Sequence, residues 1–256
     1  MSLFLTFIIF ILGLIFGSFA NVLIYRIPKK ISILFPNSFC PHCFSPINWY
    51  DNIPVLSYIL LSGKCRTCGK KISLVYPIVE LLCGVLAVFV YLKFGIETMW
   101  IFFNLFFILL VISAIDIQTT EIPDVLSFYL IISGIIFSVF NPLLGKKVLI
   151  GDTSFIRIAN SLIGGISGFL IFFLIDLFGS KIFKRSVLGG GDIKLLSGIG
   201  TYLGIHSLFK IIFFSSLVGT VYIFVFSITK KKKLFGEYIQ FSPFISIGCL
   251  IYVFLL

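Results

Sequence analysis

Long apolar runs, separated by short polar segments, occupy almost the whole chain of 256 residues. A transmembrane helix needs about 20 mostly apolar residues. Hydrophobic residues make up 59% of the sequence and charged residues only 12%, whereas an average soluble domain has roughly 25% charged residues. The pattern predicts an all-α polytopic membrane protein with about eight transmembrane helices. The predicted spans are Leu3–Tyr25, 76–93, 99–116, 125–143, 158–178, 193–206, 209–228 and 239–256.

Residues 27–75 form one sizeable polar segment, rich in Pro, Asn, Ser, Cys, Gly and Lys. Positive charge in short loops favours the cytoplasmic side of a membrane. Basic residues follow the first span and recur within this segment, so we expect it to be a cytoplasmic insertion. These residues are Arg26, Lys29, Lys30, Lys64, Arg66, Lys70 and Lys71.

The same rule divides the rest of the chain. It places the 144–157 loop outside the cell, although this loop contains Lys146, Lys147 and Arg157. The 193–206 span is short for a bilayer crossing, so its depth in the membrane is not predicted. Membrane orientation and anionic lipid headgroups explain the net charge of +10 better than nucleic acid binding does. We expect three parts: a first transmembrane helix (1–26), the insertion (27–75) and a transmembrane domain (76–256).

Four of the six cysteines form two pairs, Cys40-Pro-His-Cys43 and Cys65-Arg-Thr-Cys68. Each pair presents two thiolates to one ion, and the spacing between the pairs is close to the roughly 15–20 residues typical of zinc sites. Two disulfides are the alternative, but the cytoplasm keeps thiols reduced. We therefore expect a structural zinc ion that supplies most of the folding free energy of the insertion.

Two aspartates stand at the ends of apolar runs, among only ten acidic residues. Asp116 ends the run Trp100–Ile115, and Asp192 follows the three glycines Gly189–Gly191. By the predicted topology both lie at cytoplasmic ends of helices. Two carboxylates within hydrogen-bond distance share one proton, as in aspartic proteases. In the alternative interpretation both only cap helices, and Asp192, directly before Ile193, suits an N-cap.

Several stretches occur together in one order: Gly13–Pro28, the two cysteine pairs with Trp49–Tyr58 between them, Tyr76–Glu80, Ile115–Asp116 with Ile122–Asp124, and Gly189–Leu195. This ordered set, which covers nearly the whole chain, resembles the type IV prepilin leader peptidases, membrane aspartic proteases of the Gly-x-Gly-Asp kind. Ala20 departs from the larger apolar residue that is frequent in the family, at a position with no catalytic role.

The resemblance implies that Asp116 and Asp192 are the catalytic pair of a transmembrane aspartic protease domain (76–256). It implies supporting roles for Asp124, Gly189, Gly191 and Lys194. Such enzymes lie in the bacterial inner membrane and cleave the basic leader of prepilins and pseudopilins after a glycine, on the cytoplasmic side. Many also methylate the new N-terminal residue with S-adenosylmethionine, although this sequence has no glycine fingerprint for a nucleotide.

Two other functional classes make different predictions. A transporter or channel would carry acids across the membrane depth and inverted repeats, and neither is apparent. A zinc-dependent membrane assembly factor without catalysis would tolerate asparagine at both aspartates. A basic leader is expected to dock near the acidic residues Asp51, Glu80, Glu121 and Asp124.

Overall fold

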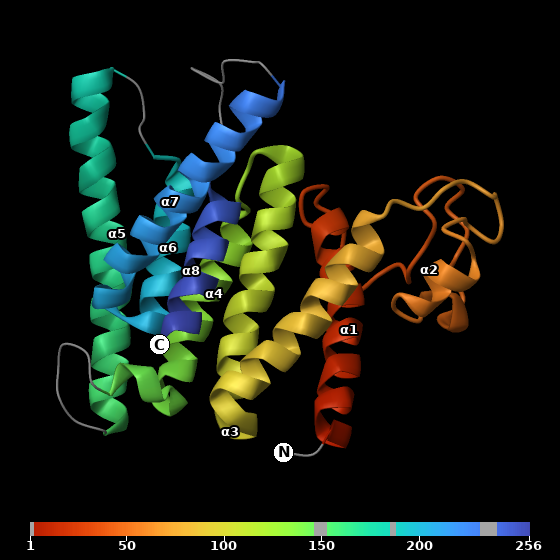
Figure 1. Cartoon of the computed structure of the whole chain (residues 1–256), viewed down its shortest axis with the longest axis horizontal. Coiled ribbons are helices and arrows are strands. Elements are labelled where there is room, and N and C mark those ends of the chain that lie inside the picture. The colour runs from red at the N-terminus through yellow and green to blue at the C-terminus, as the bar shows by residue number, and fades with distance from the viewer. Residues whose placement is uncertain (1–2, 146–152, 185–187, 231–239) are drawn as a thin grey trace. The chain divides into compact units, whose positions relative to one another are not determined.

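A computed structural model of the chain describes residues 3–145, 153–184, 188–230 and 240–256 (Figure 1). Within these residues there are two isolated β-bridges and no β-strand, which confirms the all-α fold class. The α-helices are α1 (Leu3–Arg26), α2 (Leu56–Leu60), α3 (Val75–Thr119), α4 (Asp124–Phe137), α5 (Ser154–Phe183), α6 (Gly190–Leu203), α7 (Ile205–Lys230) and α8 (Ser242–Leu255). The 3-10 helices are η1 (Trp49–Asn52), η2 (Ser138–Phe140) and η3 (Pro142–Leu144).

The helices fit a multi-pass membrane protein. By length and composition α1, α3, α5 and α7 can each cross a membrane, whereas α4 and α8 are shorter apolar helices. Each span predicted from the sequence overlaps a helix, and two of them, 76–93 and 99–116, correspond to the two helical segments of α3, which is interrupted at Gly95 (φ +70°, ψ 175°). Because α4, α6 and α8 are shorter than the usual span, the count of eight spans stays a prediction.

The chain divides into two compact units, Met1–Phe103 and Asn104–Leu256, and the boundary between them falls inside α3. The first unit contains the polar insertion and the second contains both candidate catalytic aspartates. The division into three parts at residues 26 and 75 stays a prediction. It separates the insertion from the helices that flank it.

In the first unit, small residues bring α1 and the first part of α3 close together. A Cβ atom added at Gly13 would lie 2.7 Å from the Gly84 Cα atom, and one added at Gly17 would lie 2.5 Å from the Glu80 Cα atom. Such contacts allow close packing of membrane helices. At the end of α1 the buried Arg26 guanidinium donates to four carbonyl oxygens of the insertion, those of Ser32, Ile33, Pro36 and Asn37.

In the second unit, α6 packs against α4 and α5 (Figure 1). The backbones of Gly164 and Gly200 approach so closely that neither position has room for a Cβ atom. The buried Tyr202 hydroxyl lies 2.8 Å from Asn104 Oδ1 and 2.9 Å from Ser133 Oγ. This packing fixes the position of α6, the helix whose first turn contains Asp192.

The turn between α6 and α7 lies earlier than the sequence suggested. The apolar pattern placed it between residues 206 and 209, but α6 ends at Leu203 and α7 begins at Ile205. Gly204 between them has a φ of +76°, which glycine adopts without a steric clash.

Two basic residues named in the predicted topology, Lys146 and Lys147 of the 144–157 loop, lie outside the described residues.

Candidate functional site

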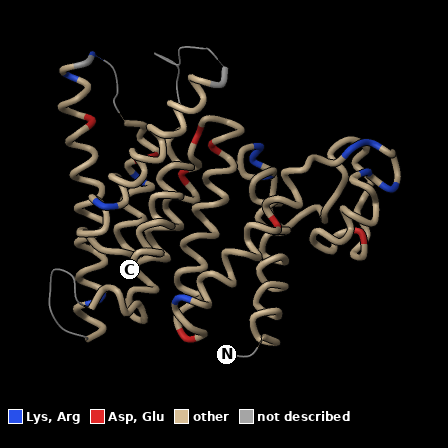
Figure 2. The backbone as a smooth tube through the Cα atoms, in the orientation of Figure 1, with Lys and Arg blue, Asp and Glu red and all other residues tan. Residues whose placement is uncertain are grey.

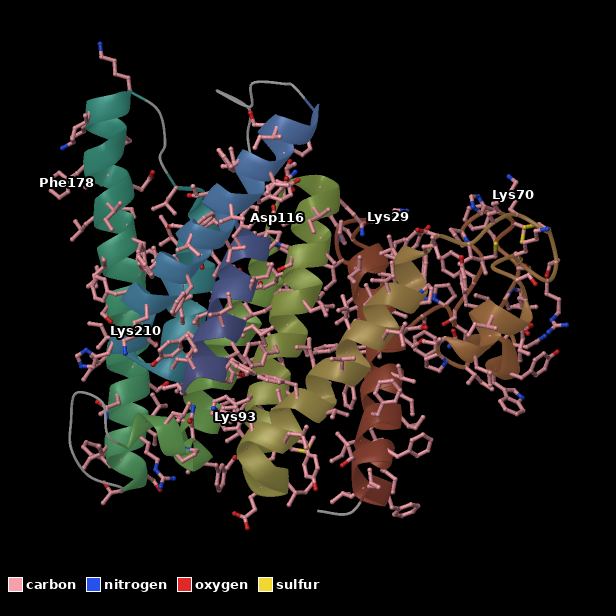
Figure 3. All side chains as sticks on the ribbon, viewed as in Figure 1. Lys29, Lys70, Lys93, Asp116, Phe178 and Lys210 are labelled. Atoms are coloured by element: carbon pink, nitrogen blue, oxygen red, sulfur yellow. The ribbon has the colours of Figure 1, made fainter. Side chains whose placement is uncertain are left out.

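Asp116 lies in the last turns of α3, within the second unit (Figure 3). Its side chain is buried, with 5% of the residue exposed. The hydroxyl group of Ser242, at the start of α8, donates a hydrogen bond of 2.7 Å to Asp116 Oδ2. A buried carboxylate held by one hydroxyl group is fixed in orientation, and its second oxygen remains for another partner.

Asp192 lies in the first turn of α6, close enough to Asp116 for the two carboxylates to interact electrostatically. The backbone N–H of Gly189 donates to its side chain. Its Oδ1 atom is buried and has no hydrogen-bond partner among the described residues. Buried polar atoms are nearly always paired, so an unpaired carboxylate oxygen beside a second carboxylate indicates a place for water or substrate.

The capping interpretation of Asp192 needs a correction. The N-cap of α6 is Gly189, three residues earlier than the sequence suggested, and it makes no side-chain cap. Asp192 instead reaches back to the Gly189 backbone N–H, as the third residue of a capping box does. This contact uses one oxygen and leaves Oδ1 of the same carboxylate without a partner.

The glycines before Asp192 differ in the space around them. A Cβ atom added at Gly191 would lie 2.8 Å from Ile122 Cβ, in the loop between α3 and α4, whereas nothing lies within 4 Å of one added at Gly190. Gly191 therefore lets the start of α6 lie directly against the loop that follows Asp116.

For the peptidase activity that the sequence resemblance implies, we predict that Gly191→Ala lowers the rate of leader cleavage by about tenfold or more, because the added methyl group displaces the first turn of α6 and with it Asp192. Gly190→Ala is the matched control, since its methyl group enters open space. Initial rates of both purified variants on one prepilin substrate measure the difference. Equal rates for the two variants would show that the Ile122 contact does not position the aspartate.

Asp124 and Lys194, the two predicted supporting side chains, form an ion pair. Lys194 Nζ lies 2.6 Å from Asp124 Oδ1, and the Asp124 side chain is 59% exposed. The pair links the first residue of α4 to the fifth residue of α6. An exposed ion pair of this kind adds little stability.

Sequence reasoning missed Ser242, which hydrogen-bonds to Asp116. A signal was present, because Pro243 follows this serine at the start of an apolar run, and proline is common in the first turn of a helix. Nothing in the sequence pattern indicates that this turn packs beside Asp116.

The four predicted zinc ligands come together in the first unit (sulfur atoms near Lys70 in Figure 3). Their Sγ atoms lie within 4.8 Å of one another, and those of Cys40 and Cys68 are 4.0 Å apart. Four thiolates at the usual zinc–sulfur distance of about 2.3 Å would be separated by about 3.8 Å. The six cysteines are free thiols, so the two-disulfide alternative is not supported. The residues fit a tetrahedral metal ion.

The two cysteine pairs adopt equivalent turns. The Phe44 N–H donates to the Cys40 carbonyl and the Gly69 N–H to the Cys65 carbonyl, each at 2.9 Å. Both donor residues have positive φ, +57° at Phe44 and +68° at Gly69. Each turn thus points two sulfur atoms to the same side, and the two turns face one another across the candidate metal position.

The thiols of this cluster differ in acidity. Hydrogen bonds from the side chain and backbone of Ser45 lower the pKa of Cys43 to about 6. Backbone hydrogen bonds within its own turn lower the pKa of Cys65. At Cys68 the Lys70 backbone lowers the pKa, but burial and the neighbouring thiols outweigh it and raise the pKa to about 11. Thiolates are the form that binds a metal ion, so metal binding at the four cysteines would release the protons that they carry.

Asp51 ties η1 to the second cysteine turn. Its carboxylate accepts two hydrogen bonds from Arg66, at 2.8 and 2.7 Å. This bidentate pair lowers the pKa of Asp51. Asp51 and Asp124 are thus both paired with a basic side chain, in contrast to the free acids expected of a docking site for a basic leader.

Two known protein families match successive parts of the chain, and the boundary between the matches lies close to the boundary between the two compact units. Residues 11–94 match the bacterial Peptidase A24 N-terminal domain, and residues 103–224 match the type IV leader peptidase family. The first match contains the cysteine cluster and the second contains both aspartates.

Three similar proteins that cover most of the chain carry the same description. The prepilin leader peptidase/N-methyltransferase of Vibrio cholerae is 36% identical over 257 residues, covering 95% of this chain and 94% of that protein. Those of Neisseria gonorrhoeae and Klebsiella pneumoniae are 32% and 35% identical, covering 93% and 78% of this chain and 86% of each relative. No solved structure matches the chain significantly.

Proposed function

Because the chain belongs to the type IV leader peptidase family, a family of proteases, we propose that Asp116 and Asp192 form the catalytic pair of an aspartic endopeptidase. One observation carries this proposal: two largely buried carboxylates from α3 and α6 interact, and Asp192 Oδ1 has no hydrogen-bond partner among the described residues. The substrates we propose are prepilins or pseudopilins, cleaved after the glycine that ends their basic leader.

The chemistry needs one ionised and one protonated carboxyl group. The ionised group takes a proton from water, whose oxygen forms a bond to the scissile carbonyl carbon, while the protonated group gives its proton to the carbonyl oxygen. When the tetrahedral intermediate collapses, the carbon–nitrogen bond breaks, the leaving amine takes a proton from one carboxyl group, and a hydroxyl group of the intermediate returns its proton to the other carboxylate. One shared proton is then again on the pair. Ser242 keeps Asp116 oriented through this cycle.

The second activity we propose is methylation of the amine that cleavage exposes. The lone pair of the amine nitrogen forms a bond to the methyl carbon as the carbon–sulfur bond of S-adenosylmethionine breaks, and one amine proton passes to water. The relatives are named for both activities. The first unit, with a proposed structural zinc ion on Cys40, Cys43, Cys65 and Cys68, is the part of the chain that the peptidase chemistry does not use.

We also propose that the active site lies at the cytoplasmic face of the bacterial inner membrane. Lys and Arg gather on the insertion of the first unit (Figure 2), and positive charge in short loops stays in the cytoplasm. Asp116, Glu121 and Asp124 follow one another at the end of α3 and the start of α4. Because Asp124 is paired with Lys194, Glu121 is the exposed acid that a basic leader would meet there.

The direct test uses the purified full-length protein in lipid vesicles, with a prepilin and S-adenosylmethionine. We expect the leader to be released and the mature chain to gain the mass of one methyl group, both measured by mass spectrometry. A prepilin with its cleavage-site glycine replaced by a bulky residue is the control and should stay intact. Ion flux without cleavage would favour a transporter instead, and no activity on any prepilin would favour an assembly factor.

A further inference from the structure

Three stretches that the peptidase chemistry does not use meet around one cavity in the first unit. They are the end of α1 near Asn21, the insertion around Asp51–Val55, and the first turns of α3 from Tyr76 to Glu80. The cavity has a volume of about 380 Å³. Sites for drug-sized ligands measure about 300–1,000 Å³, so a nucleoside-sized molecule fits here.

Two acidic residues line this cavity, Asp51, which is paired with Arg66, and Glu80, of which only 9% is exposed. Its Oε2 atom accepts a 2.7 Å hydrogen bond from the Val55 N–H, and the Asn21 side chain also donates to it. Within residues 3–145, no Lys, Arg or His lies within ion-pair distance of Glu80. Neutral donors therefore hold a buried carboxylate whose charge has no counter-ion, which is costly unless a ligand supplies one.

Val55, whose N–H donates to Glu80, has a strained backbone conformation. Val55 has a φ of +61°, a left-handed conformation that β-branched residues rarely adopt. In this conformation its N–H points to Glu80 Oε2. Strain of this kind costs about 1–3 kcal/mol and concentrates at ligand sites, so the Val55 turn indicates a site built for binding.

The rest of the cavity wall matches a ligand with an aromatic base and an amino-acid end. Tyr25, Phe39, Tyr58 and Tyr76 supply aromatic surface, on which bases stack and cations bind. Lys70 and Lys71 are basic groups on the same wall that can meet a carboxylate. One buried negative charge, aromatic surface and exposed lysines complement a cationic nucleoside that also carries a carboxylate.

We infer that this cavity binds S-adenosylmethionine and that the Glu80 carboxylate is the counter-charge of its sulfonium group. The inference rests on the proposed methyltransferase function and assigns the site of that activity. Cys40 lies on the cavity wall, so the metal cluster has a structural part in forming the site. In this assignment Glu80 binds the methyl donor, and this role replaces the docking of the basic leader that the sequence led us to expect at Glu80.

The test compares Glu80→Gln with wild type by calorimetric binding to the full-length protein in lipid nanodiscs. The ligands are S-adenosylmethionine and S-adenosylhomocysteine, which lacks the sulfonium charge. We expect Glu80→Gln to weaken binding of S-adenosylmethionine about tenfold or more and binding of S-adenosylhomocysteine by less than about threefold. Glu97→Gln is the matched control, because Glu97 is an exposed acid on the same helix, outside the cavity.

Wild-type affinity in Glu80→Gln, or equal weakening for both ligands, would overturn the assignment of Glu80. A thermal unfolding midpoint and a size-exclusion profile like those of wild type show that the variant is folded. A Glu80→Gln variant that binds both ligands normally but cleaves poorly would place the leader, and not the methyl donor, at this carboxylate.

A second measurement needs no substitution. Wild-type protein is irradiated with radiolabelled S-adenosylmethionine, and the labelled peptide is identified by mass spectrometry. Label on the aromatic residues of the cavity supports the inference, and label confined to residues 104–256 overturns it. If wild type cleaves prepilins but neither binds nor methylates, the proposed methyltransferase function itself is wrong. If wild type methylates normally, but no label lies on the cavity residues and Glu80→Gln binds S-adenosylmethionine like wild type, only the assignment of this site is wrong.

Discussion

Asp116→Asn and Asp192→Asn are each expected to lower the rate of leader cleavage by about 1,000-fold or more. Asparagine keeps the size of the side chain and an oxygen that can accept the Ser242 or Gly189 hydrogen bond. It cannot take up or release a proton, so neither half of the general acid–base cycle can run. Single-turnover cleavage of a prepilin by each purified variant, in excess over substrate, measures the chemical step without product release.

The control for this loss is Asp176→Asn on α5. Asp176 Oδ1 accepts a 2.9 Å hydrogen bond from the Leu188 N–H, and the asparagine oxygen can accept the same bond. We expect this variant to cleave within about twofold of wild type. The two catalytic-pair variants should also still bind S-adenosylmethionine, because that proposed site belongs to the first unit. Normal processing by either variant would contradict the assignment of the catalytic pair.

Much of the site could be predicted because its parts are local in sequence. The spacing of Cys40, Cys43, Cys65 and Cys68 brings the four sulfur atoms together through two short turns, and each turn is fixed by its own backbone hydrogen bonds. Asp116 and Asp192 end or begin apolar runs, so hydropathy alone places each at the end of a helix. The glycines before Asp192 indicate a close backbone contact, and the structure supplies Ile122 as its partner.

The remaining features depend on packing between distant segments. Hydropathy separates 76–93 from 99–116 at the polar Glu97, and the backbone is interrupted two residues earlier, at Gly95, whose positive φ has no signal in the apolar pattern. The contact of Ser242 with Asp116 joins residues 126 positions apart in the chain. The counter-charge role of Glu80 follows from a cavity and from a strained turn at Val55, neither of which has a sequence signal.

Loss of the metal cluster is expected to separate the two proposed activities. We predict that Cys40→Ser with Cys68→Ser removes bound zinc and unfolds the insertion, because zinc binding contributes about 10–16 kcal/mol to the folding free energy of small zinc domains. Methylation should then fall about 100-fold or more. Leader cleavage should stay within about tenfold of wild type, since Asp116, Asp192 and Ser242 all belong to the second unit. Metal analysis, limited proteolysis of residues 27–75 and assays of both activities measure these effects.

Cys83→Ser is the control for this double substitution. Cys83 is fully buried in the first unit but does not belong to the metal cluster, so the same exchange of sulfur for oxygen there costs packing energy and should leave zinc content unchanged. Chelation of wild-type protein should reproduce the double variant, and added zinc should restore methylation only where the four thiols are present. If the chelated protein resists proteolysis and methylates at the wild-type rate, the cluster is not a structural metal site. If chelation also abolishes leader cleavage, the second unit depends on the folded insertion, and the two activities are not separable in this chain.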